Sequence, residues 1–203
     1  ENLYSTYDPD RIITTIIARL KSTRLTKKVL REFHNDGMVF DLYNYVSQAK
    51  SSIKTILTTS YLDTDDDLVS EAEMREIDVY RGHPLIVIDR LLAVAEEEKA
   101  SAVFRITGDM PFADPILMDI MANMREKSDL DYVRVMNFPL GMSAELISTK
   151  YLQKLYQEME DPRQSEYLGW FVMLDKDTRK GCLKVNFNGL DLSKYSLTVD
   201  YQE

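Results

Sequence analysis

The feature that most constrains the fold is a run of apolar and β-branched residues that is followed at once by a cluster of positive charge. The run covers residues 12–18 and reads Ile-Ile-Thr-Thr-Ile-Ile-Ala, which predicts a buried strand. The next segment carries six positive side chains and no acid, although the net charge of the chain is −9. These residues are Arg19, Lys21, Arg24, Lys27, Lys28 and Arg31. A cationic loop at the carboxyl end of a first strand is where an open α/β sheet binds a phosphate-bearing ligand.

A second apolar run ends in an acidic turn. Residues 102–107 are predicted to form a strand, and the sequence Gly108-Asp109-Met110-Pro111 follows, so the carboxylate of Asp109 lies at a strand tip. Mg²⁺ is commonly bound by one or two carboxylates together with substrate phosphates. Taken alone, a Gly-Asp pair is most often a plain turn. Together with the basic segment, it indicates an enzyme that handles nucleotides.

Strand and helix patterns alternate along the chain, which predicts an α/β domain. The expected strands cover residues 12–18, 53–59, 77–80, 102–107, 132–136, 183–187 and 195–199. The expected helices cover residues 38–49, 63–75, 84–99, 114–125, 149–159 and 166–174. We expect one domain over residues 11–203, with a small excursion at 137–190. Residues 1–10 are expected to be an N-terminal arm or the remnant of a purification tag.

Composition excludes several classes of function. Cys182 is the single cysteine, so the chain forms no internal disulfide, and with only His34 and His83 beside it a structural zinc site is not expected. The negative net charge argues against broad nucleic-acid binding. No apolar run approaches the roughly 18–20 residues that span a bilayer, and no signal peptide is visible. We therefore expect a cytoplasmic protein without membrane insertion, whose basic segment binds a small ligand.

The order of these motifs resembles the cytidylyltransferases that activate sugars as CMP derivatives, in the branch of the spore-coat-polysaccharide type. Acylneuraminate and 3-deoxy-manno-octulosonate cytidylyltransferases are more distantly similar. The likeness runs in order over residues 11–201. The matching stretches are residues 17–30, Tyr80-Arg81-Gly82, Asp89-Arg90, residues 104–115, Phe138-Pro139-Leu140-Gly141 and Leu197-Thr198-Val199-Asp200.

The resemblance implies a single Rossmann-like nucleotidyltransferase domain with a mixed, mostly parallel sheet and helices on both faces. It implies a Mg²⁺-dependent enzyme that transfers CMP from CTP to a hydroxyl of a sugar or sugar acid, for a surface polysaccharide or glycan. It also implies a homodimer. The residues that match nucleotide-binding positions of the family are Ala18, Arg19, Ser22, Arg24, Lys28, Thr59, Ser60 and Arg81. Those that match its metal-binding positions are Asp109 and Asp200, and Arg19, Lys28 and Asp109 are the expected catalytic residues.

The sequence departs from the family pattern in the phosphate loop. Ile17, Lys21, Thr26 and Lys27 stand where the family usually carries Gln, Gly, Pro and Gly. Losing both glycines limits how closely the backbone can approach a phosphate. A catalytically degenerate relative that binds a nucleotide or a partner without turnover is therefore an alternative. A nucleotidyltransferase that uses another base or a non-sugar acceptor is a third hypothesis.

Further departures lie toward the C-terminal half. Leu140 replaces a common Asp, and residues 166–169 read Glu-Tyr-Leu-Gly where the family has Glu-His-Val-Thr, which leaves the acceptor open. The chain ends at Glu203, three residues after Asp200, where relatives continue, so a truncated chain or a following domain is expected.

Several polar and aromatic groups have structural interpretations. The acidic run of residues 65–67 is expected to begin a helix rather than to bind metal. His34 and His83 are expected in loops. Trp170 and its aromatic neighbours Tyr167 and Phe171 are expected in the core or a dimer interface rather than as a platform for a sugar.

Overall fold

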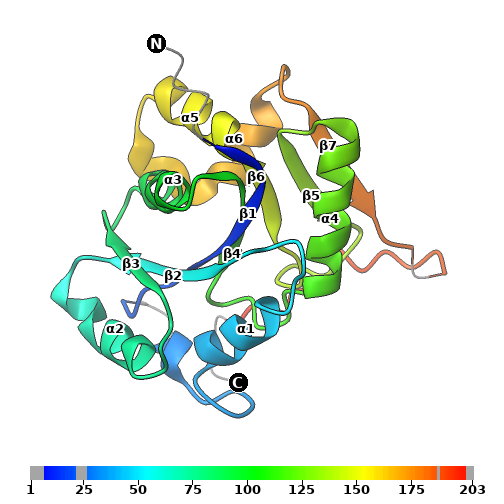
Figure 1. Ribbon diagram of the computed structural model, residues 1–203. Coiled ribbons are helices and arrows are strands. Elements are labelled where there is room, and N and C mark those ends of the chain that lie inside the picture. The colour runs from blue at the N-terminus through cyan, green and yellow to red at the C-terminus, as the bar shows by residue number, and fades with distance from the viewer. Residues whose placement is uncertain (1–6, 22–26, 187, 200–203) are drawn as a thin grey trace.

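The computed structural model describes residues 7–21, 27–186 and 188–199, and a seven-stranded sheet runs through their centre (Figure 1). The strands lie in the order β3-β2-β1-β4-β6-β5-β7. Their bounds are β1 Asp8–Ile17, β2 Thr55–Ser60, β3 Val79–Gly82, β4 Ala100–Thr107, β5 Tyr132–Met136, β6 Glu145–Ser148 and β7 Lys180–Lys184. Strand β1 is parallel to both of its neighbours, β2 and β4, while β6 is antiparallel to β4 and β5. The expected mixed, mostly parallel sheet is therefore confirmed.

Helices cover both faces of the sheet, with α3 and α5 above it and α1 and α2 below it in Figure 1. Their bounds are α1 Met38–Val46, α2 Asp66–Glu73, α3 Val87–Glu97, α4 Pro115–Ser128, α5 Thr149–Glu158 and α6 Leu168–Leu174. Short 3-10 helices are η2 Lys28–Leu30, η3 Asp63–Asp65 and η4 Pro162–Tyr167. None of the helices in the described ranges has the length and apolar character that a transmembrane span requires.

The apolar run of β1 supplies side chains to a separate core on each face of the sheet. Ile16 packs with Phe40 of α1 and Leu68 of α2, whereas Ile13 packs with Leu91 of α3 on the other face. A strand buried on both faces reads as a continuous apolar run, as this one does. This burial agrees with the interior position of β1, between β2 and β4.

The start of α4 agrees with its sequence signal, and the start of α3 does not. Asp114 caps α4 by accepting a hydrogen bond from the Ile116 N–H at 2.7 Å. Helix α3 was expected from Pro84 and begins at Val87. The reason is that His83 Nδ1 accepts the backbone N–H groups of residues 85 and 86 at 3.1 Å each, which holds this segment as a turn.

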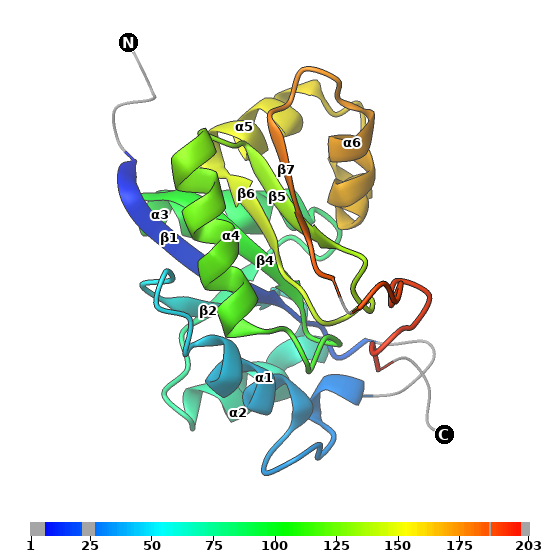
Figure 2. The ribbon, with the colours of Figure 1, turned by 90° about the vertical axis from the view of Figure 1, so that its right-hand side faces the viewer.

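Two strand predictions for the C-terminal region need correction. The strand expected over 183–187 is found at Lys180–Lys184, because it pairs along the whole of β5 (Figure 2). Residues 195–199 form no regular strand and make a single bridge between Leu140 and Ser196. Their partner is the irregular segment around Gly141, whose φ of +94° does not continue a ladder. The short strand β6 was missed and lies within the expected excursion.

Candidate active site

The carboxyl ends of β1 and β4 meet at one edge of the sheet. Ile17 and Thr107 are partners in the register of these two strands, and the Gly108 N–H donates to the Ile17 carbonyl at 2.8 Å. The segment that follows β1 and the turn that follows β4 therefore begin side by side. Parallel strands place the loops after them on a common edge, where α/β proteins bind ligands.

Lys28 and Asp109 face each other at this edge. Lys28 Nζ lies 2.9 Å from Asp109 Oδ2, and the two side chains are only 11% and 25% exposed. The other carboxylate oxygen, Oδ1, accepts the hydroxyl of Thr107 at 2.5 Å. Each carboxylate oxygen of Asp109 therefore accepts one of these two hydrogen bonds. The structure brings together two expected catalytic residues that lie 81 positions apart in the sequence.

Gly108 allows this close packing. A Cβ at that position would lie 2.9 Å from the Cβ of Ala18 and 3.3 Å from a methyl group of Val29. Ala18, an expected nucleotide-binding residue, has a buried side chain, so it can offer a ligand only its backbone. A larger residue in place of Gly108 would push the Asp109 turn away from the segment after β1.

Arg19 extends the cationic side of the site. Its guanidinium donates to the Pro84 carbonyl at 2.7 Å and lies 4.0 Å from a carboxylate oxygen of Glu166. Arg19, Lys28 and Asp109 line a pocket of about 130 Å³, which the structure thus forms from the three expected catalytic residues. Its full lining is Ile17, Arg19, Lys28, Val29, Val87, Arg90, Arg105, Thr107, Gly108, Asp109 and Glu166.

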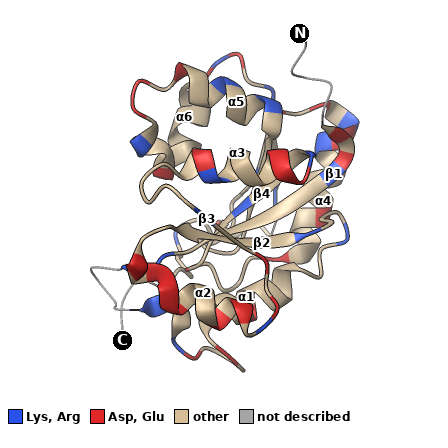
Figure 3. Cartoon of the chain, turned by 60° about the vertical axis from the view of Figure 1, so that its left-hand side comes forward, with Lys and Arg blue, Asp and Glu red and all other residues tan. Residues whose placement is uncertain are grey.

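Asp65 anchors the chain after β1, a role that the sequence analysis missed. Its buried carboxylate accepts the Leu20 N–H at 2.8 Å and also accepts the N–H and the hydroxyl of Ser60. The run of residues 65–67 does begin helix α2, as expected (Figure 3). Asp65, however, makes no capping bond to that helix and instead ties the end of β2 to the phosphate-loop segment.

Ser60 and Arg81 lie near this edge but do not line the 130 Å³ pocket. The Ser60 side chain is fully buried against Asp65, so its predicted contact with a nucleotide gains no support from its position. Arg81 donates to the Ser60 carbonyl at 3.1 Å and to Asp66 at 2.6 Å. It thereby fixes the loop between β2 and α2, and its contact with cytidine stays a prediction.

Three expected site residues, Ser22, Arg24 and Asp200, lie outside the described residues. The residue that precedes Asp200 is described, and its position is informative. The Val199 N–H donates to the carbonyl of Asp109 at 3.0 Å. The C-terminal segment therefore reaches the turn that carries the expected metal-binding carboxylate.

The donor set at this edge fits a hard divalent cation. Within the ranges that the structure describes, no group of three or more His, Cys, Asp or Glu side chains is arranged to hold a metal. Asp109 supplies a partly exposed carboxylate at the pocket. Since Mg²⁺ needs few protein ligands when substrate phosphates and water complete its shell, this chemistry suits Mg²⁺.

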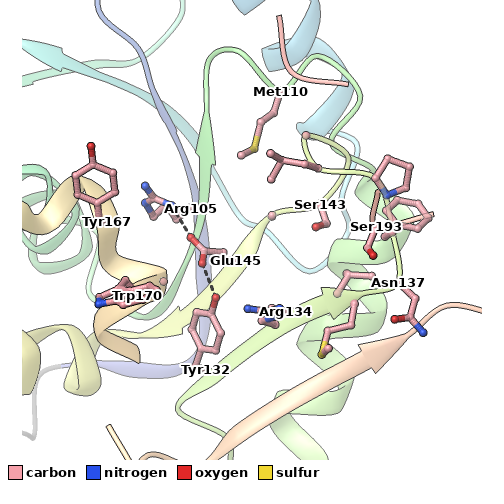
Figure 4. A pocket seen from close by; sticks show the side chains of 18 residues that line it. Arg105, Met110, Tyr132, Arg134, Asn137, Ser143, Glu145, Tyr167, Trp170 and Ser193 are labelled. Atoms are coloured by element: carbon pink, nitrogen blue, oxygen red, sulfur yellow. Dashed lines mark hydrogen bonds and ion pairs between the residues drawn. The ribbon is translucent and has the colours of Figure 1, made fainter. Parts of the chain in front are cut away.

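A second pocket of about 570 Å³ adjoins the first, and Arg105 lines both of them (Figure 4). Arg105 forms an ion pair with Glu145 and donates to the Glu166 carbonyl at 2.9 Å. Tyr132 donates its hydroxyl to Glu145, and burial together with that carboxylate raises the pKa of Tyr132. Gly169 makes room for this network, because a Cβ there would lie 2.9 Å from Glu145 Oε1.

Two aromatic residues of this region, Trp170 and Tyr167, lie at the pocket, whereas Phe171 packs against the core as expected. Trp170 and Tyr167 are each 69% exposed and stand on one side of the 570 Å³ pocket, as Figure 4 shows. Their expected place in the protein core is therefore wrong. Their exposure leaves the dimer interface and the sugar platform open as interpretations.

Arg90, Arg105 and Glu145 were also missed as site residues. The sequence could have indicated Arg90, because this residue lies on the apolar face of a helix, between Val87 and Val94. A charged residue at such a position points into the fold. Arg105 and Glu145 had no comparable signal, since their pairing depends on the antiparallel strand β6.

Comparison with known proteins defines the class. The family model of the cytidylyltransferases matches residues 13–167, so this chain belongs to that family and is a nucleotidyltransferase.

Individual relatives refine this assignment. The spore coat polysaccharide biosynthesis protein SpsF of Bacillus subtilis is 35% identical over 202 residues, which cover 95% of this chain and 82% of that protein. The 3-deoxy-manno-octulosonate cytidylyltransferase of Solibacter usitatus is 32% identical over 114 residues, or 55% of this chain and 43% of that protein. The resemblance to the spore-coat-polysaccharide branch is thus confirmed.

Solved structures agree at the level of the fold. A cytidylyltransferase from Leptospira borgpetersenii superimposes with a TM-score of 0.84 at 24% identity, covering 94% of this chain and 81% of that chain. A CMP-2-keto-3-deoxy-manno-octonic acid synthetase complexed with CTP gives a TM-score of 0.66 at 15% identity, covering 89% and 93%.

Proposed function

We propose that this protein transfers CMP from CTP to a hydroxyl of a sugar or sugar acid, in the synthesis of a surface polysaccharide or glycan. The observation that carries this proposal is the 2.9 Å approach of Lys28 to Asp109 beside Arg19, at the carboxyl edge of β1 and β4. Membership of the cytidylyltransferase family and the similarity to SpsF support it.

The reaction requires charge neutralisation and alignment. The acceptor hydroxyl oxygen forms a bond to the α-phosphorus of CTP, the bond to the bridging oxygen breaks, pyrophosphate leaves and the hydroxyl proton is released. Arg19 can grip phosphate oxygens with its planar fork, and Lys28 offers a compact charge. Their separation from bulk water strengthens both interactions, since Lys28 is only 11% exposed.

Asp109 and Asp200 would hold the Mg²⁺ ion of this reaction. The ion, when bound, supplies positive charge to the phosphates as a Lewis acid. Thr107 orients the carboxylate of Asp109 through its hydroxyl. Lys28 balances the charge of that carboxylate at 2.9 Å. The contact between Val199 and Asp109 supports a shared site with Asp200.

The acceptor is proposed to enter the 570 Å³ pocket. Arg105 lines both this pocket and the 130 Å³ pocket, so an acceptor bound here would lie beside the proposed nucleotide site. Glu145, Asn137 and Ser143 offer hydrogen bonds to hydroxyl groups, and Trp170 offers an apolar face. Sugar ligands use this combination of polar groups and flat apolar surface.

Pyrophosphate release from CTP over a panel of sugars and sugar acids tests the proposal. We expect release with at least one acceptor, with a dependence on Mg²⁺ and a loss of about 10²-fold or more in kcat for Asp109→Ala. Asp119→Ala, which removes a carboxylate on α4 that accepts the Ser51 N–H, is the matched control. Turnover of the Asp109→Ala protein at the unaltered rate would remove Asp109 from the mechanism.

One observation favours a second function, nucleotide binding without turnover. Lys27 occupies a glycine position of the family loop and adopts a φ of 49°. Calorimetric CTP binding with and without Mg²⁺, followed by the pyrophosphate assay, separates the two functions. Metal-dependent binding with no turnover on any acceptor would favour this one.

A thermal-shift screen of CTP, UTP, GTP and ATP tests the hypothesis of another base.

A further inference from the structure

Arg90 is a charged residue in the interior of the protein. It lies in α3 and is 0% exposed, among the largest fully buried side chains. Its helical neighbours Val87, Leu91 and Val94 are buried as well. A guanidinium cannot lose its charge by deprotonation at neutral pH, so such a position normally requires a carboxylate partner.

The surroundings of Arg90 leave its charge largely uncompensated. Nη1 makes one long hydrogen bond, 3.4 Å, to the carbonyl of Thr58. Nε and Nη2 are buried and have no hydrogen-bond partner among the described residues. Burial, and secondly the charge of Arg19, lower the pKa of Arg90 to about 10, and the carboxylates of Asp65 and Glu166 oppose this shift without cancelling it. Leaving buried donors without hydrogen bonds is costly, so a partner from outside the described residues is expected.

The fold reserves space for this side chain. A Cβ at Gly82, the last residue of β3, would lie 2.6 Å from Cγ and 3.3 Å from Cδ of Arg90. Arg90 lines the 130 Å³ pocket together with Arg19, Lys28 and Asp109. Arg90 is therefore a direct neighbour of the three expected catalytic residues.

We infer that Arg90 is a further substrate-binding residue, whose Nε and Nη2 donate to phosphate oxygens of the bound nucleotide. A phosphate supplies the acceptor atoms that the described residues do not offer to Nε and Nη2, together with negative charge, and a guanidinium fork suits both. This inference rests on the proposed CTP site. The phosphate that Arg90 contacts is either the α-phosphate or the pyrophosphate portion of CTP. Binding measurements with CTP, CMP and cytidine distinguish the two.

Calorimetry with CTP, CMP and cytidine tests the inference on the full chain. We expect Arg90→Met, which keeps the unbranched part of the side chain out to the position of Nε and removes its charge, to weaken CTP binding at least tenfold and to leave cytidine binding within twofold. An equal loss for CMP assigns the contact to the α-phosphate, and unchanged CMP binding assigns it to the pyrophosphate portion. Arg90→Gln, which keeps one donor, is expected to weaken CTP binding as well.

The matched control is Arg125→Met. Arg125 of α4 is half-buried and also has a buried Nε without a partner among the described residues, but it donates to the Ser101 carbonyl and does not line the pocket. CTP binding to this variant is expected to stay unchanged. A comparable loss of CTP affinity in Arg125→Met would overturn the inference, because it would trace the effect to the removal of any buried cation.

Thermal unfolding without ligand provides a second readout. If the partner of Arg90 is a bound phosphate, its charge does not stabilise the ligand-free protein. The ligand-free Arg90→Met protein then melts at the same temperature as the unaltered protein or higher. If Arg90 has only a structural role, the Arg90→Met protein melts at a lower temperature and binds CTP with unchanged affinity. Either a lower melting temperature or an unchanged CTP affinity overturns the inference. A lack of CTP binding by the unaltered protein would contradict the proposed function and this inference together, whereas unchanged affinity in Arg90→Met contradicts the inference alone.

Discussion

A single backbone conformation distinguishes the phosphate loop of this protein. Lys27 precedes η2 with φ 49° and ψ 32°, in the left-handed region. That conformation costs a residue with a Cβ about 1 kcal/mol relative to glycine. We therefore expect Lys27→Gly to raise the free energy of unfolding by about 0.5–1 kcal/mol. The exposed ion pair of Lys27 with Asp67 offsets little of this gain. Urea denaturation measures the change.

Lys99 provides the control for this substitution. It has a φ of 52° and lies between α3 and β4, at the edge of the sheet opposite to the site. Lys99→Gly is expected to give the same stabilisation and to leave pyrophosphate release unchanged. A lower stability of Lys27→Gly beside a higher one of Lys99→Gly would mean that the contact of Lys27 with Asp67 outweighs the backbone strain.

At the scale of elements, Asp65 holds the loop after β1 to the end of β2. Asp65→Asn keeps the shape of the side chain but places an amide group where the carboxylate accepts N–H and O–H groups of Leu20 and Ser60. Because one of these donors then loses its partner, we expect the free energy of unfolding to fall by about 1–3 kcal/mol. CTP binding should weaken too, since Arg19 directly precedes Leu20. Denaturation and calorimetry measure the two effects, and Asp63→Asn, which removes an exposed charge two residues earlier in the same acidic segment, is the control.

The connection between α6 and β7 depends on another aspartate. Asp175 accepts hydrogen bonds from Lys154, at 2.8 Å, from Thr178 and from Tyr151. The bonds from Lys154 and then Thr178 hold the pKa of Asp175 well below its usual range. The carboxyl returns to about 3.9 in the unfolded chain. Its contribution to stability is therefore fully present above about pH 4 and is lost as the pH falls toward the folded pKa.

Asp175→Asn checks this dependence. We expect the variant to be less stable near neutral pH and to lose less stability than the unaltered protein when the pH falls from about 4 to about 2.5. Denaturant titrations over that range measure it. Parallel curves for the two proteins would show that other carboxyl groups account for the acid sensitivity.

At the scale of the whole molecule, the sequence predicted the buried parallel strands well, and it predicted β6 and the segment of residues 195–199 poorly. Buried parallel strands read as continuous apolar runs, so residues 12–18 and 102–107 marked β1 and β4, and their tips located Lys28 and Asp109. Strand β6 has four residues and is antiparallel to β4. No local sequence pattern predicts such a short strand or its direction. The apolar residues of 195–199 pack on the segment around Gly141 instead of joining the sheet. Such choices depend on tertiary contacts that local periodicity does not contain.

The expected homodimer is a property of the whole molecule, and helix α6 offers the surface for it. Leu174 is 62% exposed, and Met173 is exposed beside it on the same short helix. Burying these side chains against a second copy would gain about 25 cal/mol per Å² of apolar surface. We expect Leu174→Glu to convert a dimer to a monomer in sedimentation velocity, because an unpaired buried carboxylate is unfavourable. CTP affinity should not change, since Leu174 lines neither pocket. Lys176→Glu alters an exposed charge two residues away and should leave the dimer intact. A monomer for the unaltered protein at micromolar concentration would contradict this assembly.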